Sequence, residues 1–566
     1  MPKPDLSYSL IYINLLCKFY YTLIIFIQKK AERSVKREGL KILFSYSVLA
    51  FMENEGIGRR SVRTLSSLLV GKAGGVILSA ITFIIVARLL GPSGYGIYTL
   101  AIGIYSFIGA VGHLGIGTYF NKHISEFIYK EKYERLNEVL SAGCYILFPV
   151  AILLMLVGIA SSGLIASYFR FQSLHVLTVI IASVVLFFSM TYGALYPALV
   201  SFGRGKWAAY SIIIIQLVNL VGSVFFILIG LSYDGALLGL MLSYLVGLVL
   251  TAHYIKRAME PFGGLRLVRV SFSKIKNILS FSLPMAANNF VNNGILNFGI
   301  MMLGIYASSV ILGNFGAAMK GLNLIQTFYV TTGVVLLPTF AAIVARRKRI
   351  ERSYNKVISY SLLINLPVII YIGIFAKPMF YILVTNKYSL APLYLLFISI
   401  GVAIGLPALY TAGFIVSKGC VTKVLKYNTI SAIAQLIALL FLIPYLKAIG
   451  VILSLFIIGG LVNDFLFIRG VERLFNIRPA IMHMAKIFFA NLILALILLP
   501  SFLLHNAWLI LIVGLLISLF AYPIIIALMH LIGDEFIRDL RNFSKGLPLI
   551  EGLINIIINY VKYFID

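Results

Sequence analysis

Apolar runs of about 20 residues recur along the whole chain, and no other feature restricts the possible folds as strongly. A helix of that length rises about 1.5 Å per residue and spans the roughly 30 Å hydrocarbon core of a bilayer. The chain has 566 residues, of which 61% are hydrophobic and 12% charged, and its mean hydropathy is +1.00. Soluble domains are about 45–50% apolar and about 25% charged. The sequence therefore predicts an all-α integral membrane protein.

We predict about 14 transmembrane helices, at 64–87, 95–116, 140–160, 175–198, 208–230, 235–255, 278–303, 310–337, 355–376, 389–415, 428–445, 448–468, 487–504 and 507–532. From residue 52 onward, lysine and arginine concentrate before the first span, in every second loop and in the tail, most densely in 256–276 and 345–356. This positive-inside pattern predicts a multi-pass protein of the cell membrane with both termini in the cytoplasm. Basic loops near anionic headgroups explain the net charge of +28, so no nucleic acid partner is expected.

The two ends of the chain fall outside this pattern. Residues 1–63 form an N-terminal extension and cytoplasmic leader with an apolar segment at 10–27. That segment is either an extra membrane-associated helix or precedes an alternative start at Met52, and the sequence leaves both readings open. The tail at 533–566 mixes charged and apolar residues at near-helical spacing, which indicates an amphipathic segment on the cytoplasmic face.

A weak internal repeat suggests the domain organisation. The stretch at 87–107 is echoed at 300–324, where a Leu-Gly pair and a short turn again precede a glycine- and aromatic-containing helix start. The offset of six spans is even, so both copies cross the membrane in the same direction. This predicts an N-lobe at 64–276 with six helices, a C-lobe at 277–468 with six more, and two appended helices within 469–532. Transporters built from such repeats bind their substrate between the lobes.

Motifs for metal or nucleotide chemistry are missing from the sequence. Cys17, Cys144 and Cys420 are far apart and form no CxxC pair, and the seven histidines include no HExxH. No P-loop pattern is present either. We therefore expect no cofactor, no metal and no catalytic residues, and the chain is predicted not to be an enzyme.

Two lysines stand out inside the predicted spans, away from the helix ends: Lys72 in the first and Lys320 in the eighth. A lysine near the centre of a membrane helix costs about 2.5–3.5 kcal/mol on insertion scales, so it usually faces protein or a watery cavity. One lysine in each lobe suits a central cavity that receives an anion. The alternative is that each snorkels or pairs with helix-end carbonyls. The scarcity of acidic residues in the spans also points to an anionic substrate.

Span seven contains a row of asparagines. Asn289, Asn293 and Asn297 recur at i, i+4 and i+8, which places them on one face of a helix, and Pro284 predicts a bend near its start. Amides both donate and accept hydrogen bonds, which suits sugar hydroxyls or phosphate oxygens in a cavity. Asparagine also commonly joins membrane helices to one another, and this second reading stays open.

One carboxylate lies inside a span. Asp464, beside Asn463, is near the cytoplasmic end of span twelve. The pair is a candidate site for a coupling Na⁺ or H⁺. The simpler interpretation is a helix-end carboxylate balanced by Arg469.

The stretch ARLLGPSGYGIYTLAIGIYSFIGAVGHLGIGTYFNKHISEF at 87–127 resembles the opening of the polysaccharide biosynthesis flippases, the O-antigen (Wzx-type) transporters. That family is grouped with the MATE exporters and the lipid II flippases in one superfamily. The segments at 195–211 and 279–290 are similar to the family's cytoplasmic turn and to the start of its second lobe. The resemblance covers roughly residues 60–530.

The resemblance implies a flippase that carries a polyprenyl-(pyro)phosphate-linked oligosaccharide across the cytoplasmic membrane by alternating access, without covalent chemistry. On this hypothesis Lys72 and Lys320 bind the phosphate, and Arg88 guides or receives it at the outer mouth. Arg63 and Arg60 collect the headgroup on the cytoplasmic side, and the asparagines of span seven contact sugar hydroxyls. Glycosyltransferases or a polymerase of the same pathway are candidate partners, together with the lipid bilayer.

Three alternatives remain open. A MATE-like antiporter for small organic cations fits the fold but lacks the membrane carboxylates that bind such cargo. A lipid II-type flippase would differ in cargo rather than in mechanism. A membrane-embedded glycosyltransferase would need a large loop with acidic catalytic residues, whereas the longest loops here have about 20 residues and are basic.

Overall fold

The structure is a computed structural model, and it describes residues 57–169, 174–346 and 350–532. The chain divides into two compact units, Ser61–Ile525 and a unit made of Met1–Arg60 and Ile526–Asp566. The predicted apolar segment at 10–27 and the predicted tail at 533–566 lie outside the described residues. The arrangement below is that of Ser61–Ile525.

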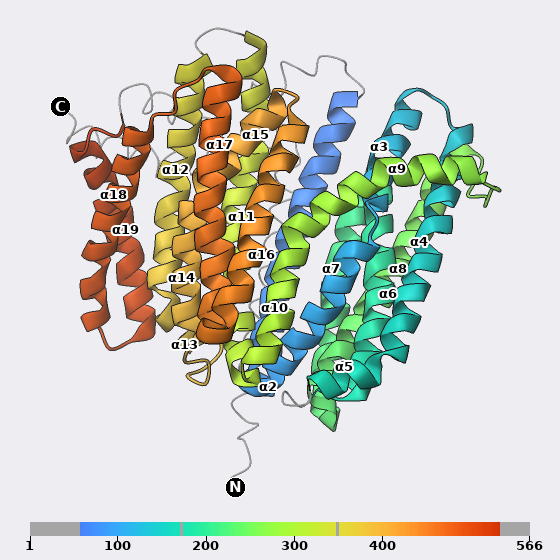
Figure 1. The fold of residues 1–566 in the computed structure, drawn as a ribbon, viewed down its shortest axis with the longest axis horizontal. Helices are drawn as coiled ribbons and strands as arrows, with labels where there is room; N and C mark the ends of the chain where they lie inside the picture. Colours follow the sequence, from blue (N-terminus) through green and yellow to red (C-terminus); the bar gives the residue numbers. More distant parts are fainter. Residues whose placement is uncertain (1–56, 170–173, 347–349, 533–566) are drawn as a thin grey trace, which may run out of the picture. The chain divides into compact units, whose positions relative to one another are not determined.

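Helices follow one another along the described chain (Figure 1). The α-helices are α2 (Ile57–Gly112), α3 (Ile116–Tyr129), α4 (Glu134–Ala160), α5 (Ser162–Tyr168), α6 (Val176–Ser201), α7 (Gly205–Phe226), α8 (Ser232–Met259), α9 (Phe272–Asn289), α10 (Ile295–Tyr306), α11 (Ser309–Arg346), α12 (Ile350–Ile374), α13 (Ala376–Leu383), α14 (Ala391–Ile404), α15 (Leu406–Ser417), α16 (Val421–Ile452), α17 (Gly459–Phe475), α18 (Ile481–Leu498) and α19 (Ala507–Leu528). Short π- and 3₁₀-helices join some of them: η3 (Ile227–Leu231), η4 (Glu260–Phe262), η5 (Phe290–Gly294), η6 (Leu453–Ile458) and η7 (Leu499–Leu503).

Eight helical stretches of the described chain are long and apolar enough to cross a membrane, or nine if the bent pair α14 and α15 forms one span. The chain is thus an all-helical, multi-pass integral membrane protein. The count is lower than the 14 spans predicted, because three stretches each contain a sharp break and count once, and because the α9–α10 run and α11 are not among the candidates. These stretches are Val70–Ala110, Gly205–Phe262 and Val421–Phe475, with 41, 58 and 55 residues. A straight helix of 41 residues would measure about 62 Å, twice the thickness of the hydrocarbon core.

The breaks follow from local backbone chemistry. Gly91 has φ 64° and ψ 177°, a conformation that side chains with a Cβ rarely adopt, and Pro92 then removes a helical N–H donor. Gly230, with φ 101°, separates α7 from α8 in the same way. After this break α7 and α8 pack along each other so closely that a Cβ on Gly239 would overlap the backbone of Ser223. The two helices therefore form a hairpin.

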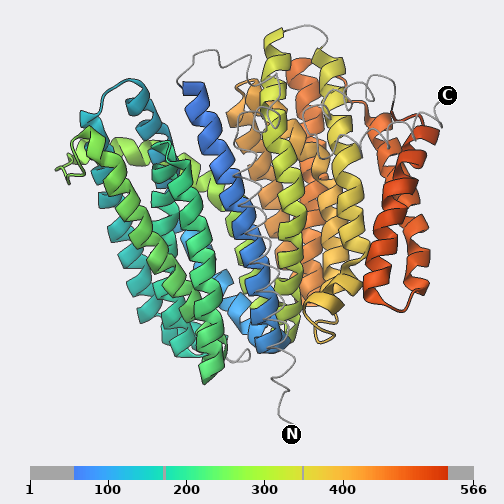
Figure 2. The same cartoon turned by 180° about the vertical axis from the view of Figure 1, so that it is seen from behind.

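The helices pack in two groups (Figures 1 and 2). In the first, α6 contacts α3, α4 and α8, and α8 also packs along α7. Its apolar core includes Phe120, Leu136, Met190, Leu199 and Met259, all of which are buried. In the second group, α11 contacts α12, α14 and α15, while α16 contacts α10 and α17, and α18 packs on α12.

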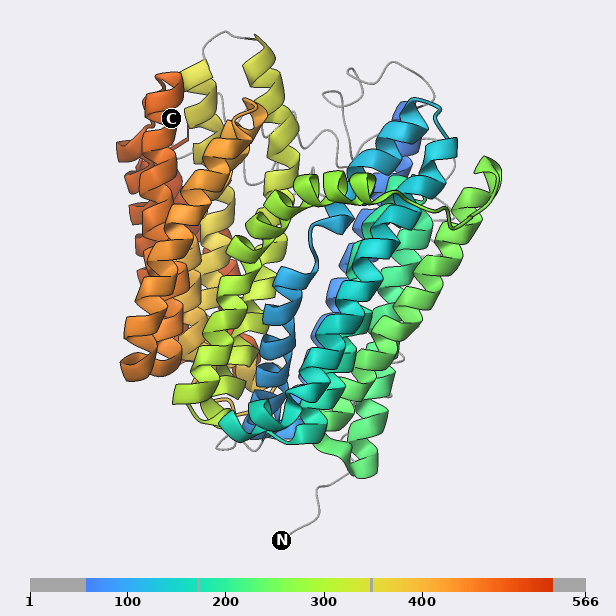
Figure 3. The same ribbon diagram turned by 45° about the vertical axis from the view of Figure 1, so that its right-hand side comes forward.

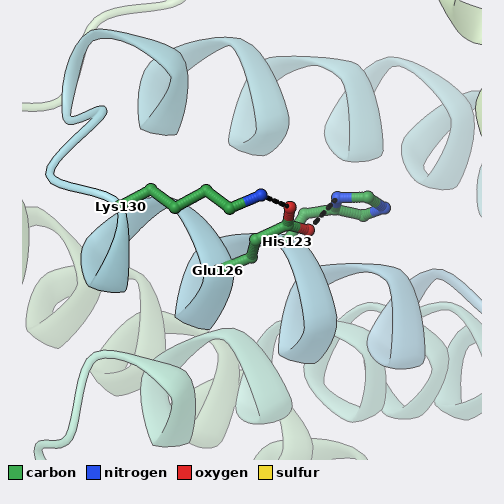
Figure 4. A network of polar contacts seen from close by, with 3 residues as sticks. All are labelled: His123, Glu126 and Lys130. Carbon is green, nitrogen blue, oxygen red and sulfur yellow. Dashed lines mark hydrogen bonds and ion pairs between the residues drawn. The ribbon is translucent and has the colours of Figure 1, made fainter.

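α3 is a short amphipathic helix at one end of the first group. Its buried residues recur at helical spacing: Ile116, Tyr119, Phe120 and Ile124. Towards its C-terminal end α3 carries a polar network in which the Lys130 ammonium group lies 2.6 Å from Glu126 and His123 lies 3.6 Å from the same carboxylate (Figure 4). The hydrogen bond from Lys130 lowers the pKa of Glu126. This helix lies outside the candidate membrane spans.

α9 connects the two groups. It contacts α3 and α4, crosses their ends, and leads through η5 into α10, which packs on α16 of the second group (Figure 3). The Lys274 ammonium group forms an ion pair of 2.5 Å with Glu138 at the start of α4. The chain thus passes from one group to the other over the end at which α3 lies.

Candidate functional site

α2 packs on α7 of the first group through Gly71 and Gly75. It meets the second group where it breaks at Gly91 and α11 begins at Ser309; we call this the Gly91 end. A Cβ on Gly96 would overlap the carbonyl oxygen of Ser309, and a Cβ on Gly313 would overlap that of Pro92. The Ser93 and Ser309 hydroxyls are 2.8 Å apart. Glycine at both positions therefore allows the two helix backbones to touch.

This contact is reciprocal with respect to the internal repeat. Pro92 and Ser309 are 217 residues apart, and so are Gly96 and Gly313. Gly96 faces Ser309, and the equivalent glycine of the second copy, Gly313, faces Pro92, the equivalent of Ser309 in the first copy. Such an isologous pairing is the geometry of a two-fold axis. The two copies of the repeat seen in the sequence pack directly against each other.

The same helix face continues away from the Gly91 end. Gly316 of α11 lies against Thr99, and Gly103 lies against Ile300 of α10. Further along, the ring of Phe107 is 5.7 Å from that of Phe298, between centroids. Small residues thus give way to aromatic ones as α2 leaves the tight contact.

Arg88 and Tyr388 tie the Gly91 end together by hydrogen bonds. The Arg88 guanidinium donates from Nε to the Leu383 carbonyl (2.8 Å) and from Nη2 to the Ile382 carbonyl (2.7 Å), which end α13. Tyr388 Oη donates to the Ala87 carbonyl at 2.8 Å. Carbonyls near a helix terminus have lost their helical donors, so these side chains fill vacant acceptors. The sequence predicted Arg88 at an outer mouth as a phosphate contact; its guanidinium binds carbonyls of the other group.

The structure places Lys320 on the face of α11 that is directed at α2. It lies one turn beyond Gly316, which contacts α2, and residues four apart share a helix face. Its side chain is half-buried. Within the described part of the chain its ammonium group has no hydrogen bond or ion pair. It lies about 16 Å along the helix axis from Ser309.

Lys72 lies on α2 beside Gly71 and Gly75, which pack against Ala209 and Ile212 of α7. Its side chain is exposed, and it too has no partner among the described residues. It is about 28 Å along the axis from Gly91, so it lies about 12 Å further from the Gly91 end than Lys320 does. The sequence predicts both lysines near mid-depth, counting from a first span that begins at residue 64. In the structure α2 begins at Ile57, so Lys72 lies 15 residues from the start of its helix.

The remaining predicted contacts are described in part. Asn289 ends α9 and Asn293 lies in η5, but their side chains are outside the described residues, as are those of Arg60 and Arg63 in the first turns of α2. Asn297 lies on α10, with its carbonyl next to Gly103. A bend was predicted from Pro284; the π-helical turn η5 interrupts the helix a few residues further on.

Asp464 has a structural contact. Its Oδ1 accepts a hydrogen bond of 2.7 Å from the N–H of Ala408, in the first turn of α15. The carboxylate thus caps a helix N-terminus of a neighbouring element. Asn463 Oδ1 is buried and, among the described residues, without a partner. Arg469, proposed from the sequence to balance Asp464, lies over the Phe465 ring at 4.7 Å. The described residues hold no cluster of His, Cys, Asp or Glu that could bind a metal.

Sequence reasoning missed Tyr388 and the Gly96–Gly313 contact. The internal repeat could have indicated the glycine contact, since both copies place a glycine one turn into the helix that follows the turn. Nothing in the sequence around Tyr388 indicates its partner, which lies 301 residues away.

Comparison with known proteins decides the family. Residues 61–344, half of the chain, match the polysaccharide biosynthesis protein family. The chain belongs to that family. No curated protein matches it at the sequence level.

Solved structures share the fold of this polysaccharide biosynthesis protein. The structure "Lipid II flippase MurJ, inward closed conformation" superposes with a TM-score of 0.68 and 15% identity, covering 84% of this chain and 99% of that chain. An inward-facing multidrug resistance MATE family transporter gives a TM-score of 0.58 at 18% identity, covering 72% and 98%. Its outward-facing counterpart gives 0.53 at 17% identity, covering 77% and 98%. At these identities the likeness concerns the MATE-like fold.

Proposed function

We propose that this protein is a flippase that moves a polyprenyl-(pyro)phosphate-linked oligosaccharide across the cell membrane by alternating access. The observation that carries the proposal is the reciprocal contact between the repeat copies at the Gly91 end. Two halves related by an axis along the membrane normal can close at one end and part at the other. The barrier to flipping is the transfer of a charged, hydrated headgroup through hydrocarbon. When the protein is closed towards one side of the membrane, a polar path can open towards the other side.

In this proposal the chain has fourteen spans. Five unbroken helices, α4, α6, α12, α18 and α19, supply one span each, and each of the three broken stretches supplies two. The bent pair α14–α15, the α9–α10 run and α11 complete the count. The N-lobe is 64–276 and the C-lobe 277–468, with two further helices within 469–532. The positive-inside pattern then places both termini in the cytoplasm and the Gly91 end on the outer side. The described conformation is closed outward.

The cations of the proposed path lie at three levels. Arg60 and Arg63 collect the headgroup at the cytoplasmic end of α2, Lys72 receives the phosphate next, and Lys320 holds it at mid-depth. Arg88 becomes available when the outer end opens and its carbonyl partners separate. An unpaired ammonium group in a membrane helix costs about 2.5–3.5 kcal/mol on insertion scales, a cost that binding an anion offsets.

The sign of the charge favours this cargo over small organic cations. Lys72 and Lys320 have no carboxylate partner among the described residues, and Asp464 is engaged with a helix N-terminus. A lipid II-type substrate shares the pyrophosphate and the polyprenyl chain, so it differs only in the headgroup that the pyrophosphate carries. Asparagines of span seven are the proposed contacts to sugar hydroxyls. Glycosyltransferases or a polymerase of the same pathway are the proposed partners.

The proposal is tested in cells that lack the gene. Lipid-linked oligosaccharides are extracted and identified by mass, and the gene is restored as wild type, as a Lys72→Ala, Lys320→Ala variant, or as Lys377→Ala. Lys377 is an exposed lysine of α13 and controls for loss of charge. Accumulation of a polyprenyl-linked glycan that wild type and Lys377→Ala clear, and the double variant does not, supports the proposal. Unchanged lipid-linked pools in the deletion would overturn it.

A further inference from the structure

The segment at 264–276 follows η4 and includes the first residues of α9, and its part up to Ser271 has no helix or strand of its own. It is nevertheless fixed to α4. Asn137 Nδ2 donates to the Gly264 carbonyl at 3.1 Å, and Asn137 Oδ1 accepts from the N–H of Arg266 at 2.9 Å. One turn further along α4, Ser141 Oγ accepts from the N–H of Val268 at 3.0 Å. The backbone of the segment is therefore held in one extended path along the helix.

This fixed path presents apolar side chains outward. Phe272 is 81% exposed and Leu267 is 74% exposed, and Leu265 and Val268 are also among the exposed large hydrophobic residues. In a water-soluble protein such a cluster marks a surface that binds a partner or a membrane. Because the backbone is hydrogen-bonded to α4, these side chains cannot turn inward without breaking those bonds.

Basic residues alternate with the apolar ones. Arg266, Arg269 and Lys276 are exposed, and Lys274 is paired with Glu138. Residues 261–276 contain no aspartate or glutamate. The surface of this segment is thus apolar and uniformly positive, so its charge is complementary to an anionic partner.

The position of the segment identifies that partner. The candidate span Gly205–Phe262 ends two residues before Gly264, so the segment begins at the level where hydrocarbon gives way to headgroups. At that level apolar side chains enter the acyl region while arginine and lysine reach the phosphates. Anionic phospholipid supplies acyl chains for the apolar side chains and phosphates for the basic side chains at the same level.

We propose that 264–276 is a lipid anchor that binds anionic phospholipid of the adjoining leaflet. Leu267 and Phe272 insert among the acyl chains, and Arg266, Arg269 and Lys276 bind headgroup phosphates. The anchor continues directly into α9, which contacts α3 and α4 and links the two helix groups (Figure 3). It thus holds this connection at the membrane surface. Binding to the cytoplasmic leaflet rests on the orientation given under the proposed function, whereas the anchor itself does not.

The test is fluorescence quenching in nanodiscs of defined lipid. The two native tryptophans, Trp207 and Trp508, are replaced by phenylalanine, and Leu267→Trp provides a single probe. Lipids brominated on the acyl chains quench a tryptophan that enters the hydrocarbon. In discs with a brominated anionic lipid we expect at least half of the probe's emission to be lost.

Charge variants then test the headgroup contacts. Arg266→Gln with Arg269→Gln is expected to reduce the quenching at least twofold, and Lys423→Gln with Lys426→Gln, which removes two exposed lysines of α16, leaves it unchanged. An unquenched probe in anionic discs would mean that the segment faces water or a protein partner, and it would overturn the proposal. Equal quenching in the Arg266/Arg269 variant would overturn it as well. The measurement requires no transport, so its result is independent of the flippase assay.

Discussion

Tyr388 and Ala87 are 301 residues apart in the chain, and the Tyr388 hydroxyl donates a hydrogen bond of 2.8 Å to the Ala87 carbonyl. The carbonyl is near the break at Gly91, and the next residue, Arg88, donates in turn to the carbonyls that end α13. Carbonyls on both sides of the Gly91 end, that of Ala87 and those that end α13, therefore accept hydrogen bonds from side chains across the contact. This makes the closed end a defined, hydrogen-bonded state.

Removing the Tyr388 hydroxyl is expected to destabilise that state. Tyr388→Phe leaves the Ala87 carbonyl without its donor in a buried site, which costs about 1–3 kcal/mol. We expect a lower midpoint in thermal unfolding of the purified protein. Tyr445→Phe serves as a control, since Tyr445 is 84% exposed. Equal midpoints for the Tyr388 variant and wild type would show that the bond does not hold the two groups.

The glycine contact gives a second prediction. Gly96→Leu or Gly313→Leu places atoms where a backbone carbonyl lies, and overpacking of this kind costs about 1–3 kcal/mol or more. The closed end should then open, and Thr99→Cys, buried in wild type, should react several-fold faster with an impermeant maleimide in a background without native cysteines. Gly163→Leu, where a Cβ meets nothing within 4 Å, is the matched control. Unchanged reactivity of Cys at position 99 would contradict the role of the contact.

Two substitutions of Asp464 distinguish a helix-capping role from a role in ion coupling. Asn keeps an oxygen that can accept the Ala408 N–H but removes the charge, whereas Ala removes the acceptor. If the residue is a helix cap, Asp464→Ala costs about 0.5–2 kcal/mol in stability and Asp464→Asn retains both most of the stability and the transport rate. We expect this result. A stable Asp464→Asn protein whose transport no longer responds to a Na⁺ or H⁺ gradient would instead identify a coupling site.

The docking of α3 should depend on pH through His123. Burial, followed by the nearby Lys122, lowers the pKa of His123, while Glu126 opposes the shift. A histidine with a lowered folded-state pKa stabilises the fold above its ordinary pKa of about 6.5, and this contribution is lost as the pH falls. Glu126, whose own pKa is lowered, stays ionised between pH 7.5 and 5.5. Burial also lowers the pKa of His113, just before α3, so a His123 variant is needed to isolate the contribution of His123.

Hydrogen exchange of the α3 peptides measures this effect. After correction for intrinsic rates, protection is expected to be lower at pH 5.5 than at pH 7.5 in wild type. In His123→Gln the difference should be reduced. The same difference in both proteins would exclude His123 as its origin.

Much of the architecture follows from local sequence, because chain breaks and helix lengths depend on nearby residues. Gly91 and Pro92 mark a turn that was predicted between two spans, and α4 and α6 lie within a few residues of the expected ranges. The repeat at 87–107 and 300–324 was also visible. Its two copies meet through Gly96 and Gly313, which no local pattern indicates, because small residues pack against many possible neighbours.

The candidate site was less predictable. Lysines in membrane helices are conspicuous because of their cost, so Lys72 and Lys320 could be selected from the sequence. Their depth depends on where each helix starts, and α2 begins at Ile57, seven residues before the predicted first span. Arg88 was selected for its charge, but its partners in α13 lie almost 300 residues away and required the fold.

The central claim is translocation of a lipid-linked glycan, and reconstitution tests it most directly. Purified protein is placed in liposomes that contain a polyprenyl-pyrophosphate-linked oligosaccharide, and an impermeant enzyme outside modifies the sugars that reach the outer leaflet. The account predicts that wild-type protein raises the rate at least tenfold above protein-free liposomes. Lys72→Gln with Lys320→Gln should remove most of this increase, and Lys377→Gln should retain it. A wild-type rate equal to that of protein-free liposomes would contradict the account.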